Sequence, residues 1–131
     1  MEMIKYKEDV DFVFEDLINS GVIPLEVLQS LKETVSTIVT HPELSRFFEF
    51  SEKVINEKDI ITSAGTILRP DRLNFNKDNS VTVIDYKTGA PSTKHHAQIN
   101  GYALALEEMG YNISEKILIY SINKNIVINK V

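Results

Sequence analysis

Two short segments hold the charged residues that could do chemistry. Residues 69–72 read Arg-Pro-Asp-Arg, and residues 83–89 read Val-Ile-Asp-Tyr-Lys-Thr-Gly. If these segments lie on adjacent strands of a hairpin that turns at residues 77–80, Asp71 and Asp85 face each other at one end of a sheet. Two carboxylates at that separation repel each other unless a cation lies between them. A hard divalent cation with oxygen ligands, Mg²⁺, Mn²⁺ or Ca²⁺, is the expected occupant.

The spacing of Asp85 and Lys87 places both side chains on one face of the predicted strand. Successive side chains of a strand point to opposite faces, so Tyr86 points away from them. A metal held by Asp85 can activate water, while the ammonium group of Lys87 orients the nucleophile or the developing anion. The backbone carbonyl of Tyr86 is within reach of the same ion. The alternative interpretation is a surface ion pair at a strand end, worth at most about 1 kcal/mol.

Composition limits the class of protein and the kind of metal. The chain has 131 residues, 43% apolar and 25% charged, which is ordinary for one globular domain. It has no cysteine, so disulfides and thiolate zinc sites are excluded. Without a signal-like N-terminus or an apolar run of about 20 residues, a cytoplasmic protein with no membrane partner is expected. The net charge of -5 weighs against nucleic-acid binding, because phosphate contacts need Lys and Arg.

The first fifty residues are predicted to be helical. Apolar residues recur at helical spacing over residues 6–19 and again after Pro24, with Gly21 as a stop signal between them. Thr40 and Glu43 form a capping-box pattern, which predicts the start of a third, short helix.

Residues 51–131 are predicted to form an αβ core, and residues 1–131 a single domain. Short apolar or β-branched segments predict strands at residues 54–56, 59–62, 66–68, 73–75, 81–87, 116–121 and 126–131, the last two joined by a turn at residues 123–125. A helix is predicted over residues 93–109, where Ala97, Gly101 and Ala105 form a ridge of small residues suited to close packing. The order predicts an α/β (α+β) fold, with a central mixed sheet flanked by helices.

Together these segments resemble the motifs of the RecB-like nucleases in the PD-(D/E)XK superfamily. The resemblance rests on Gly65 ahead of the Arg-Pro-Asp-Arg run, on the Asp-Tyr-Lys-Thr-Gly run, and on Gln98 with Tyr102 in the following helix. It covers roughly residues 54–121. The chain is similar to the nuclease domains of AddAB and RecBCD, and in detail to the C-terminal nuclease domain of UvrD-like helicases. The resemblance implies a restriction-endonuclease-like core.

The resemblance also implies a function and a set of roles. The expected activity is that of a Mg²⁺- or Mn²⁺-dependent, exonuclease-like deoxyribonuclease in a helicase–nuclease of DNA repair and recombination. Asp71 and Asp85 match the metal-binding acids, Lys87 the catalytic lysine, and Gln98 and Tyr102 the Gln-x-x-x-Tyr motif. The implied partners are DNA, as single-stranded ends, and a helicase region of the same or a partner chain. For Gln98 and Tyr102, whose spacing places them on one helical face, a helix–sheet hydrogen bond with aromatic packing is the alternative interpretation.

Four basic residues are candidates for DNA contact. Arg72 adjoins Asp71, and Lys94, His95 and His96 begin the predicted helix, where a helix N-terminus favours phosphate. Adjacent helical residues point about 100° apart, so at most one of the two histidines is expected to face the site. A solvated helix start explains these three residues equally well.

One family feature is absent from the sequence. RecB-like sites usually carry a histidine on a helix before the core, in a Gly-x-x-x-His pattern, whereas His41 is expected to be a helix cap or surface residue. Glu57 matches an upstream acidic residue of such domains, with an exposed strand-end role as the commoner case. The chain is therefore expected to be an N-terminally truncated fragment.

Two other hypotheses stay open at this point. A catalytically inactive, nuclease-like module could bind DNA or serve as a scaffold in a repair complex, and the net charge of -5 favours it. Alternatively, the motif is a coincidence in an unrelated α+β domain, and Asp71 and Asp85 would then lie far apart.

Overall fold

The computed structural model describes residues 3–50, 52–123 and 125–131. The chain divides into two compact units, Met1–Glu52 and Lys53–Val131. No helix in the described residues has both the length and the apolar composition needed to cross a lipid bilayer.

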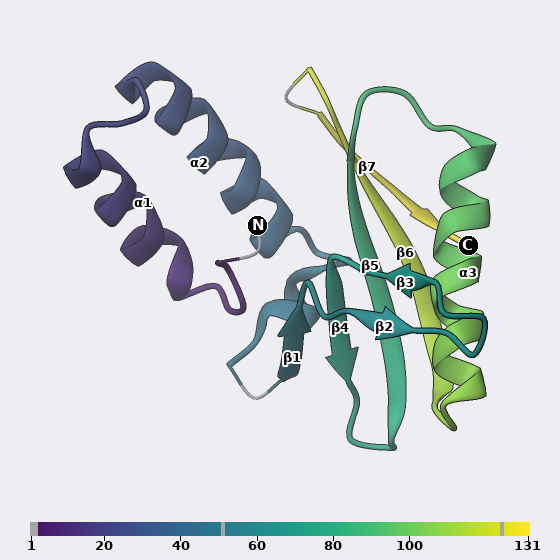
Figure 1. The fold of residues 1–131 in the computed structure, drawn as a ribbon. Helices are drawn as coiled ribbons and strands as arrows, with labels where there is room; N and C mark the ends of the chain where they lie inside the picture. The colour runs from purple at the N-terminus through teal and green to yellow at the C-terminus, as the bar shows by residue number, and fades with distance from the viewer. Residues whose placement is uncertain (1–2, 51, 124) are drawn as a thin grey trace. The chain divides into compact units, whose positions relative to one another are not determined.

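The first unit, purple to blue in Figure 1, is helical as predicted. α1 (Asp9–Ser20) ends at Gly21, whose φ of 66° is the left-handed conformation in which many helices terminate. α2 (Leu25–Thr40) begins after Pro24 and packs against α1. A short 3-10 helix, η1 (Ser45–Phe48), follows.

The predicted capping box of the third helix is wrong. Thr40 is the last residue of α2, and its hydroxyl donates to the carbonyl of Ser36 one turn earlier. Because α2 already binds this hydroxyl, it is not free to cap a new helix. His41 caps the C-terminal end of α2, and its Nδ1 accepts the N–H of Glu43, so the expectation that His41 is a cap is confirmed.

The second unit is built on a five-stranded mixed sheet. Its strands are β1 (Lys53–Asn56), β4 (Arg72–Phe75), β5 (Ser80–Thr88), β6 (Asn112–Ile122) and β7 (Asn125–Lys130), in the spatial order β1-β4-β5-β6-β7. Only the β5–β6 pair is parallel, and the helix α3 (Thr93–Glu108) makes the crossover that a parallel pair requires. The prediction of an α/β fold with a central mixed sheet is confirmed.

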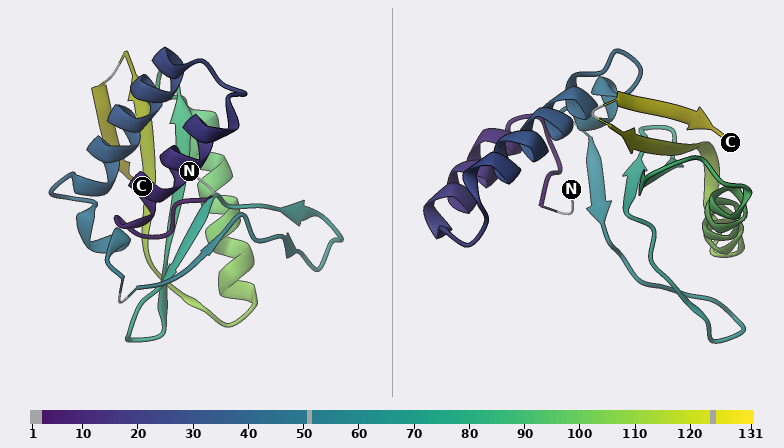
Figure 2. Two further views of the ribbon diagram at one scale, coloured as in Figure 1. Left: turned by 90° about the vertical axis from the view of Figure 1, so that its left-hand side faces the viewer. Right: turned by 90° about the horizontal axis from the view of Figure 1, so that it is seen from above.

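α3 covers one face of the sheet, beside β5 and β6 (Figures 1 and 2). The buried core of this face joins residues of α3 to residues of the strands: Ile99, Tyr102, Ala105, Leu106, Leu73, Val81, Val83, Leu118 and Tyr120. The predicted small-residue ridge is wrong in part, since Ala105 is buried but Ala97 is exposed and Gly101 only half-buried. Large apolar side chains together with Ala105 make the contact with the sheet.

A separate two-stranded sheet precedes β4. β2 (Ile60–Ile61) and β3 (Ile67–Leu68) form a hairpin that projects away from the five-stranded sheet (Figure 2). Ile60 packs in the core on the α3 face and so anchors the base of the hairpin. Ile61 and Ile67 are exposed.

Each strand differs from its sequence-based prediction by a residue or more, and the largest difference is at the start of β6. β6 begins at Asn112, earlier than predicted. Polar residues such as Glu115 break the apolar pattern of the sequence, but their backbone still pairs with β5. β7 begins at Asn125, and Lys124, the middle residue of the predicted turn, lies outside the described residues.

The packing of α3 on the sheet can be tested by a pair of substitutions on this helix. Ile99 is fully buried, so Ile99→Ala should lower the free energy of unfolding by about 2–4 kcal/mol through lost burial and a residual cavity. Leu104 is 59% exposed, and Leu104→Ala should change that free energy by less than about 0.5 kcal/mol. Urea denaturation followed by circular dichroism measures both, and equal losses would contradict the described orientation of α3.

Candidate active site

The two acids predicted to face each other lie together at the junction of β4 and β5. These strands are adjacent and antiparallel, with Arg72 opposite Ile84, as the predicted hairpin required. The N–H of Asp71 donates to Oδ1 of Asp85 at 3.0 Å, and Oδ2 of Asp71 accepts the N–H of Tyr86 at 2.8 Å. Each aspartate is therefore fixed by the segment that carries the other, and the hypothesis of a coincidental motif with distant acids is wrong.

Pro70 explains why the side chain of Asp71 takes the place of a backbone partner. Continuing the β4–β5 register by two residues brings Pro70 opposite Tyr86. In an antiparallel ladder such a pair would exchange both N–H···O bonds, but proline has no N–H to donate. The N–H of Tyr86 is satisfied by Asp71, and its carbonyl, which points to the same side of the strand, is left without that ladder donor.

Lys87 extends the cluster along the same face of β5. Its Nζ lies 3.1 Å from Oδ2 of Asp85, and the Asp85 side chain is 98% buried. Nζ also donates to Oε1 of Gln98, which is carried by α3. The half-buried ammonium is thus held between a carboxylate of the sheet and an amide of the helix.

Tyr102 lies one turn after Gln98 on α3 and is close to both acids. Burial raises the pKa of the Tyr102 hydroxyl to about 12, and the negative charges of Asp85 and Asp71 add to that rise. At neutral pH the hydroxyl therefore keeps its proton and can act only as a neutral hydrogen-bonding group. Gln98 and Tyr102 share the α3 face that meets β5, as their spacing predicted.

The electrostatics of the site are dominated by Asp71. Burial raises the pKa of Asp71 to about 6, and the neighbouring charge of Asp85 raises it too, while the Tyr86 N–H and the Lys87 ammonium lower it. Two carboxylates and one ammonium leave the cluster with an excess of negative charge. The bound form that removes this excess most directly is a complex with a cation.

The donor set suits a hard divalent cation. Asp71 and Asp85 contribute carboxylate oxygens, and the carbonyl of Tyr86 is the third oxygen nearby. No group of three His, Cys, Asp or Glu side chains that could hold a metal occurs among the described residues. Two carboxylates with the remaining positions left to water and phosphate is a usual arrangement for Mg²⁺.

Arg72 is not brought together with this cluster. Its neighbour Leu73 belongs to the core on the α3 face, so Arg72 points to the opposite face, where its Nε donates to Oδ1 of Asn74 at 2.9 Å. Arg72 is fully buried, which leaves it no surface for the predicted contact with DNA. The hydroxyl of Tyr86 is buried near Arg72 and makes no hydrogen bond of good geometry within the described residues.

The three basic residues that open α3 have different surroundings. Lys94 is exposed, and its N–H donates to the hydroxyl of Ser92, the N-cap of the helix. The Nδ1 of His95 lies 2.9 Å from the hydroxyl of Tyr120 on β6. His96 is half-buried. Of the two histidines, His95 is the one held against the sheet.

Sequence reasoning missed Tyr120 and Pro70. Tyr120 is a buried residue of β6 whose pattern signals only a strand, and nothing in the sequence links it to His95, 25 residues earlier. Pro70 was noticed as part of a motif, and its missing N–H opposite Tyr86 is the signal that could have revealed its role.

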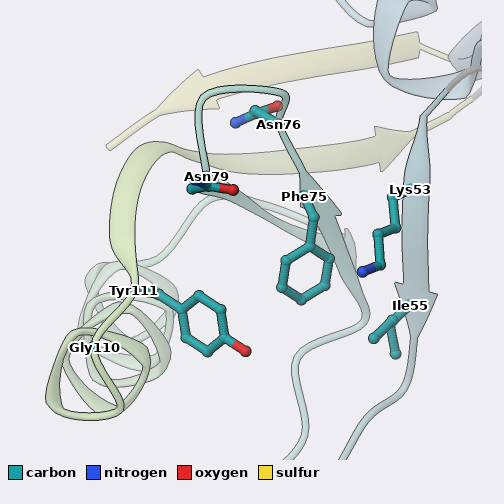
Figure 3. A pocket seen from close by; sticks show the side chains of 7 residues that line it. All are labelled: Lys53, Ile55, Phe75, Asn76, Asn79, Gly110 and Tyr111. Carbon is teal, nitrogen blue, oxygen red and sulfur yellow. The ribbon is translucent and has the colours of Figure 1, made fainter.

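A pocket of about 470 Å³ lies elsewhere on the second unit, between β1, β4 and the loop after α3 (Figure 3). Phe75 and Tyr111 meet edge to face in it, with Lys53 over the Phe75 ring. Side chains alternate in direction along an extended strand, so Asp71 and Phe75 point to the same face of the sheet. Four residues at the rise of an extended strand place their Cα atoms about 13 Å apart. The pocket contains none of the predicted site residues.

Residues 29–127 match the family described as the PD-(D/E)XK nuclease superfamily. Curated proteins give no significant match. Among solved structures, one described as "Crystal structure of SSO0001" has a TM-score of 0.46 and 16% identity, over 99% of this chain and 64% of that one. Another, "cryoEM structure DrdV-DNA complex", has a TM-score of 0.33 and 13% identity, over 98% of this chain and 12% of that one. The chain thus spans slightly less than two thirds of the first of these structures.

The raised pKa of Asp71 predicts how stability depends on pH. The folded state binds a proton at Asp71 up to about pH 6, whereas the unfolded state releases it near pH 3.8, so folding takes up protons between these values. The contribution of protonated Asp71 to the free energy of unfolding is therefore fully present below about pH 4. It is lost as the pH rises through 6. Relative to Asp71→Asn, the wild type should lose at most about 1.4 kcal/mol per pH unit, reduced further by solvent screening.

Urea denaturation between pH 4 and 7, without divalent metal, measures this difference. Asp78→Asn is the matched control, since hydrogen bonds from Ser80 lower the pKa of Asp78, in the direction opposite to the shift at Asp71. A difference between wild type and Asp71→Asn that does not change with pH would contradict the described burial of Asp71.

Proposed function

The chain belongs to the PD-(D/E)XK nuclease superfamily, and from that premise we propose that it is a metal-dependent nuclease domain that hydrolyses phosphodiester bonds in DNA. Its α/β fold, with three helices, a five-stranded mixed sheet and a small second sheet, is restriction-endonuclease-like. The observation that carries the proposal is the cluster of Asp71, Asp85 and Lys87 at the end of β5.

The finer assignment is to the RecB-like nucleases of helicase–nucleases. It is supported by the order of the motifs and by the contact of Lys87 with Gln98, which joins two of them in space. On this assignment the whole protein acts in DNA repair or recombination, a helicase region lies in the same or a partner chain, and single-stranded ends are the substrate. The chain would then be a fragment of that larger protein.

The residues that would hold the metal are Asp71, Asp85 and the carbonyl of Tyr86. When bound, Mg²⁺ or Mn²⁺ supplies a water of lowered pKa and neutralises charge on the phosphate. The chain's own contribution is to fix both carboxylates in advance. Hydrogen bonds between the backbone of each segment and the carboxylate of the other achieve this, with no reorganisation needed on binding.

Lys87 is proposed as the catalytic lysine. Its ammonium group is held between Asp85 and Gln98, so its position is fixed relative to the acids. A fixed positive charge beside the scissile phosphate orients the attacking water and stabilises the developing negative charge. Gln98 positions Lys87, and the protonated hydroxyl of Tyr102 is a donor available to the substrate or to the acids.

The test is cleavage of a labelled single-stranded oligonucleotide with Mg²⁺ or Mn²⁺. Asp85→Asn and Lys87→Ala should each lower the rate by at least about a hundred-fold, the scale on which single electrostatic groups act in catalysis. Lys77→Ala, which removes an exposed lysine from the turn at the other end of the β4–β5 pair, is the matched control and should cleave at the wild-type rate.

Isothermal titration with Mn²⁺ separates the roles of the two residues. Asp85→Asn should abolish metal binding, whereas Lys87→Ala should retain it. Equal cleavage by wild type and Lys87→Ala would instead support the second hypothesis, a nuclease-like module that binds DNA or acts as a scaffold.

Metal affinity should also depend on pH, because Asp71 must be ionised to bind a cation. With a pKa of about 6 for Asp71, roughly a tenth of the protein carries the ionised carboxylate at pH 5 and nearly all of it at pH 7.5. The apparent affinity for Mn²⁺ should therefore be about tenfold weaker at pH 5. Titration calorimetry at the two pH values checks this, and a pH-independent affinity would contradict the role of Asp71.

A further inference from the structure

The first turn of α3 carries a histidine whose ring is fixed by a buried tyrosine. The Nδ1 of His95 lies 2.9 Å from the hydroxyl of Tyr120, and the two rings are 5.5 Å apart. Tyr120 is fully buried in the core on the α3 face. His95 itself is half-buried, so part of the residue is accessible to solvent.

Counting protons identifies the tautomer of His95. The phenol of Tyr120 has one hydrogen, and a buried hydroxyl needs an acceptor for it. Nδ1 of His95 lies within hydrogen-bond distance of this hydroxyl. A hydroxyl that donates to Nδ1 leaves the single proton of the neutral imidazole on Nε2, and this is the tautomer that the inference uses. Nε2 has no hydrogen-bond partner among the described residues.

His95 lies next to the proposed catalytic residues. Tyr120 is the register partner of Lys87 across the β5–β6 pair, and Gln98, one turn after His95 on α3, binds the Lys87 ammonium. His95, Gln98 and Tyr102 follow one another at i, i+3 and i+7, which places them on one helical face. That face therefore presents an imidazole, an amide and a phenol in a row along the acids and the lysine.

We propose that His95 is a substrate-binding residue that donates a hydrogen bond from Nε2 to a phosphate oxygen of the DNA strand. The inference rests on the proposed function and names the group that would hold the strand beside the cleaved bond. A metal ligand would need a lone pair on Nε2, whereas the bond from Tyr120 leaves a proton there. Phosphate oxygens are acceptors only, so they match this donor.

The tautomer is tested without any substrate. Long-range ¹H–¹⁵N correlation spectra of the full chain at pH 8 should show the His95 proton on Nε2, and Tyr120→Phe should turn it into a mixture of both tautomers. A proton on Nδ1 in the wild type would overturn the inference.

The contact with DNA is tested by binding of a fluorescent single-stranded oligonucleotide with Ca²⁺ present. His95→Ala should weaken binding about tenfold, the effect of deleting one hydrogen bond to a charged group. His95→Gln, which retains a donor, should recover most of it. His96→Ala is the matched control and should stay within about twofold of wild type, as should the Mn²⁺ affinity of His95→Ala.

The outcomes separate this inference from the proposed function. Loss of cleavage in Asp85→Asn tests the nuclease, whereas the His95 variants are read by binding alone. Equal weakening by His95→Ala and His96→Ala, loss of Mn²⁺ binding in His95→Ala, or no binding of the oligonucleotide by wild type would each overturn the role of His95. Thermal denaturation of every variant confirms that the fold is retained in those compared.

Discussion

The repulsion between Asp71 and Asp85 is the constraint on which the rest of the site depends. Both carboxylates lie at the junction of β4 and β5, and a backbone N–H from each segment holds the carboxylate of the other. The strand pairing thus keeps together two groups that would separate in water. Burial is the main cause of the raised pKa of Asp71, and the charge of Asp85 adds to it; a bound cation would relieve this repulsion.

β6 and α3 complete the site because β5 extends beyond the end of β4. β5 runs past the end of β4, so its last residues, including Lys87, are paired on one side only, with β6. The crossover helix α3 then returns along the same face and brings Gln98 to Lys87. A parallel β5–β6 pair cannot form without such a crossover, so the topology that builds the sheet also delivers the helical half of the site.

The sequence predicted the structural features that are determined by local residue patterns and by the order of the motifs. The β4–β5 hairpin, the helix after it and the meeting of Asp71, Asp85 and Lys87 follow from strand alternation, a turn cluster and side-chain phase. Arg72 was misjudged because its burial depends on which face of β4 is covered, and a one-residue change in phase reverses that face. The choice between His95 and His96 needed Tyr120, which lies in a strand that local pattern describes only as apolar.

The excess of negative charge at this site offers a physical interpretation of the net charge of -5. A phosphate approaching Asp71 and Asp85 meets two carboxylates and one ammonium, so the local field repels it until a divalent cation is present. Lys87 cannot supply that charge alone, because its ammonium already pairs with Asp85. Arg72, the nearest guanidinium in sequence, is buried on the opposite face and cannot compensate. In the proposed nuclease, the cation rather than a basic surface would provide the attraction for DNA.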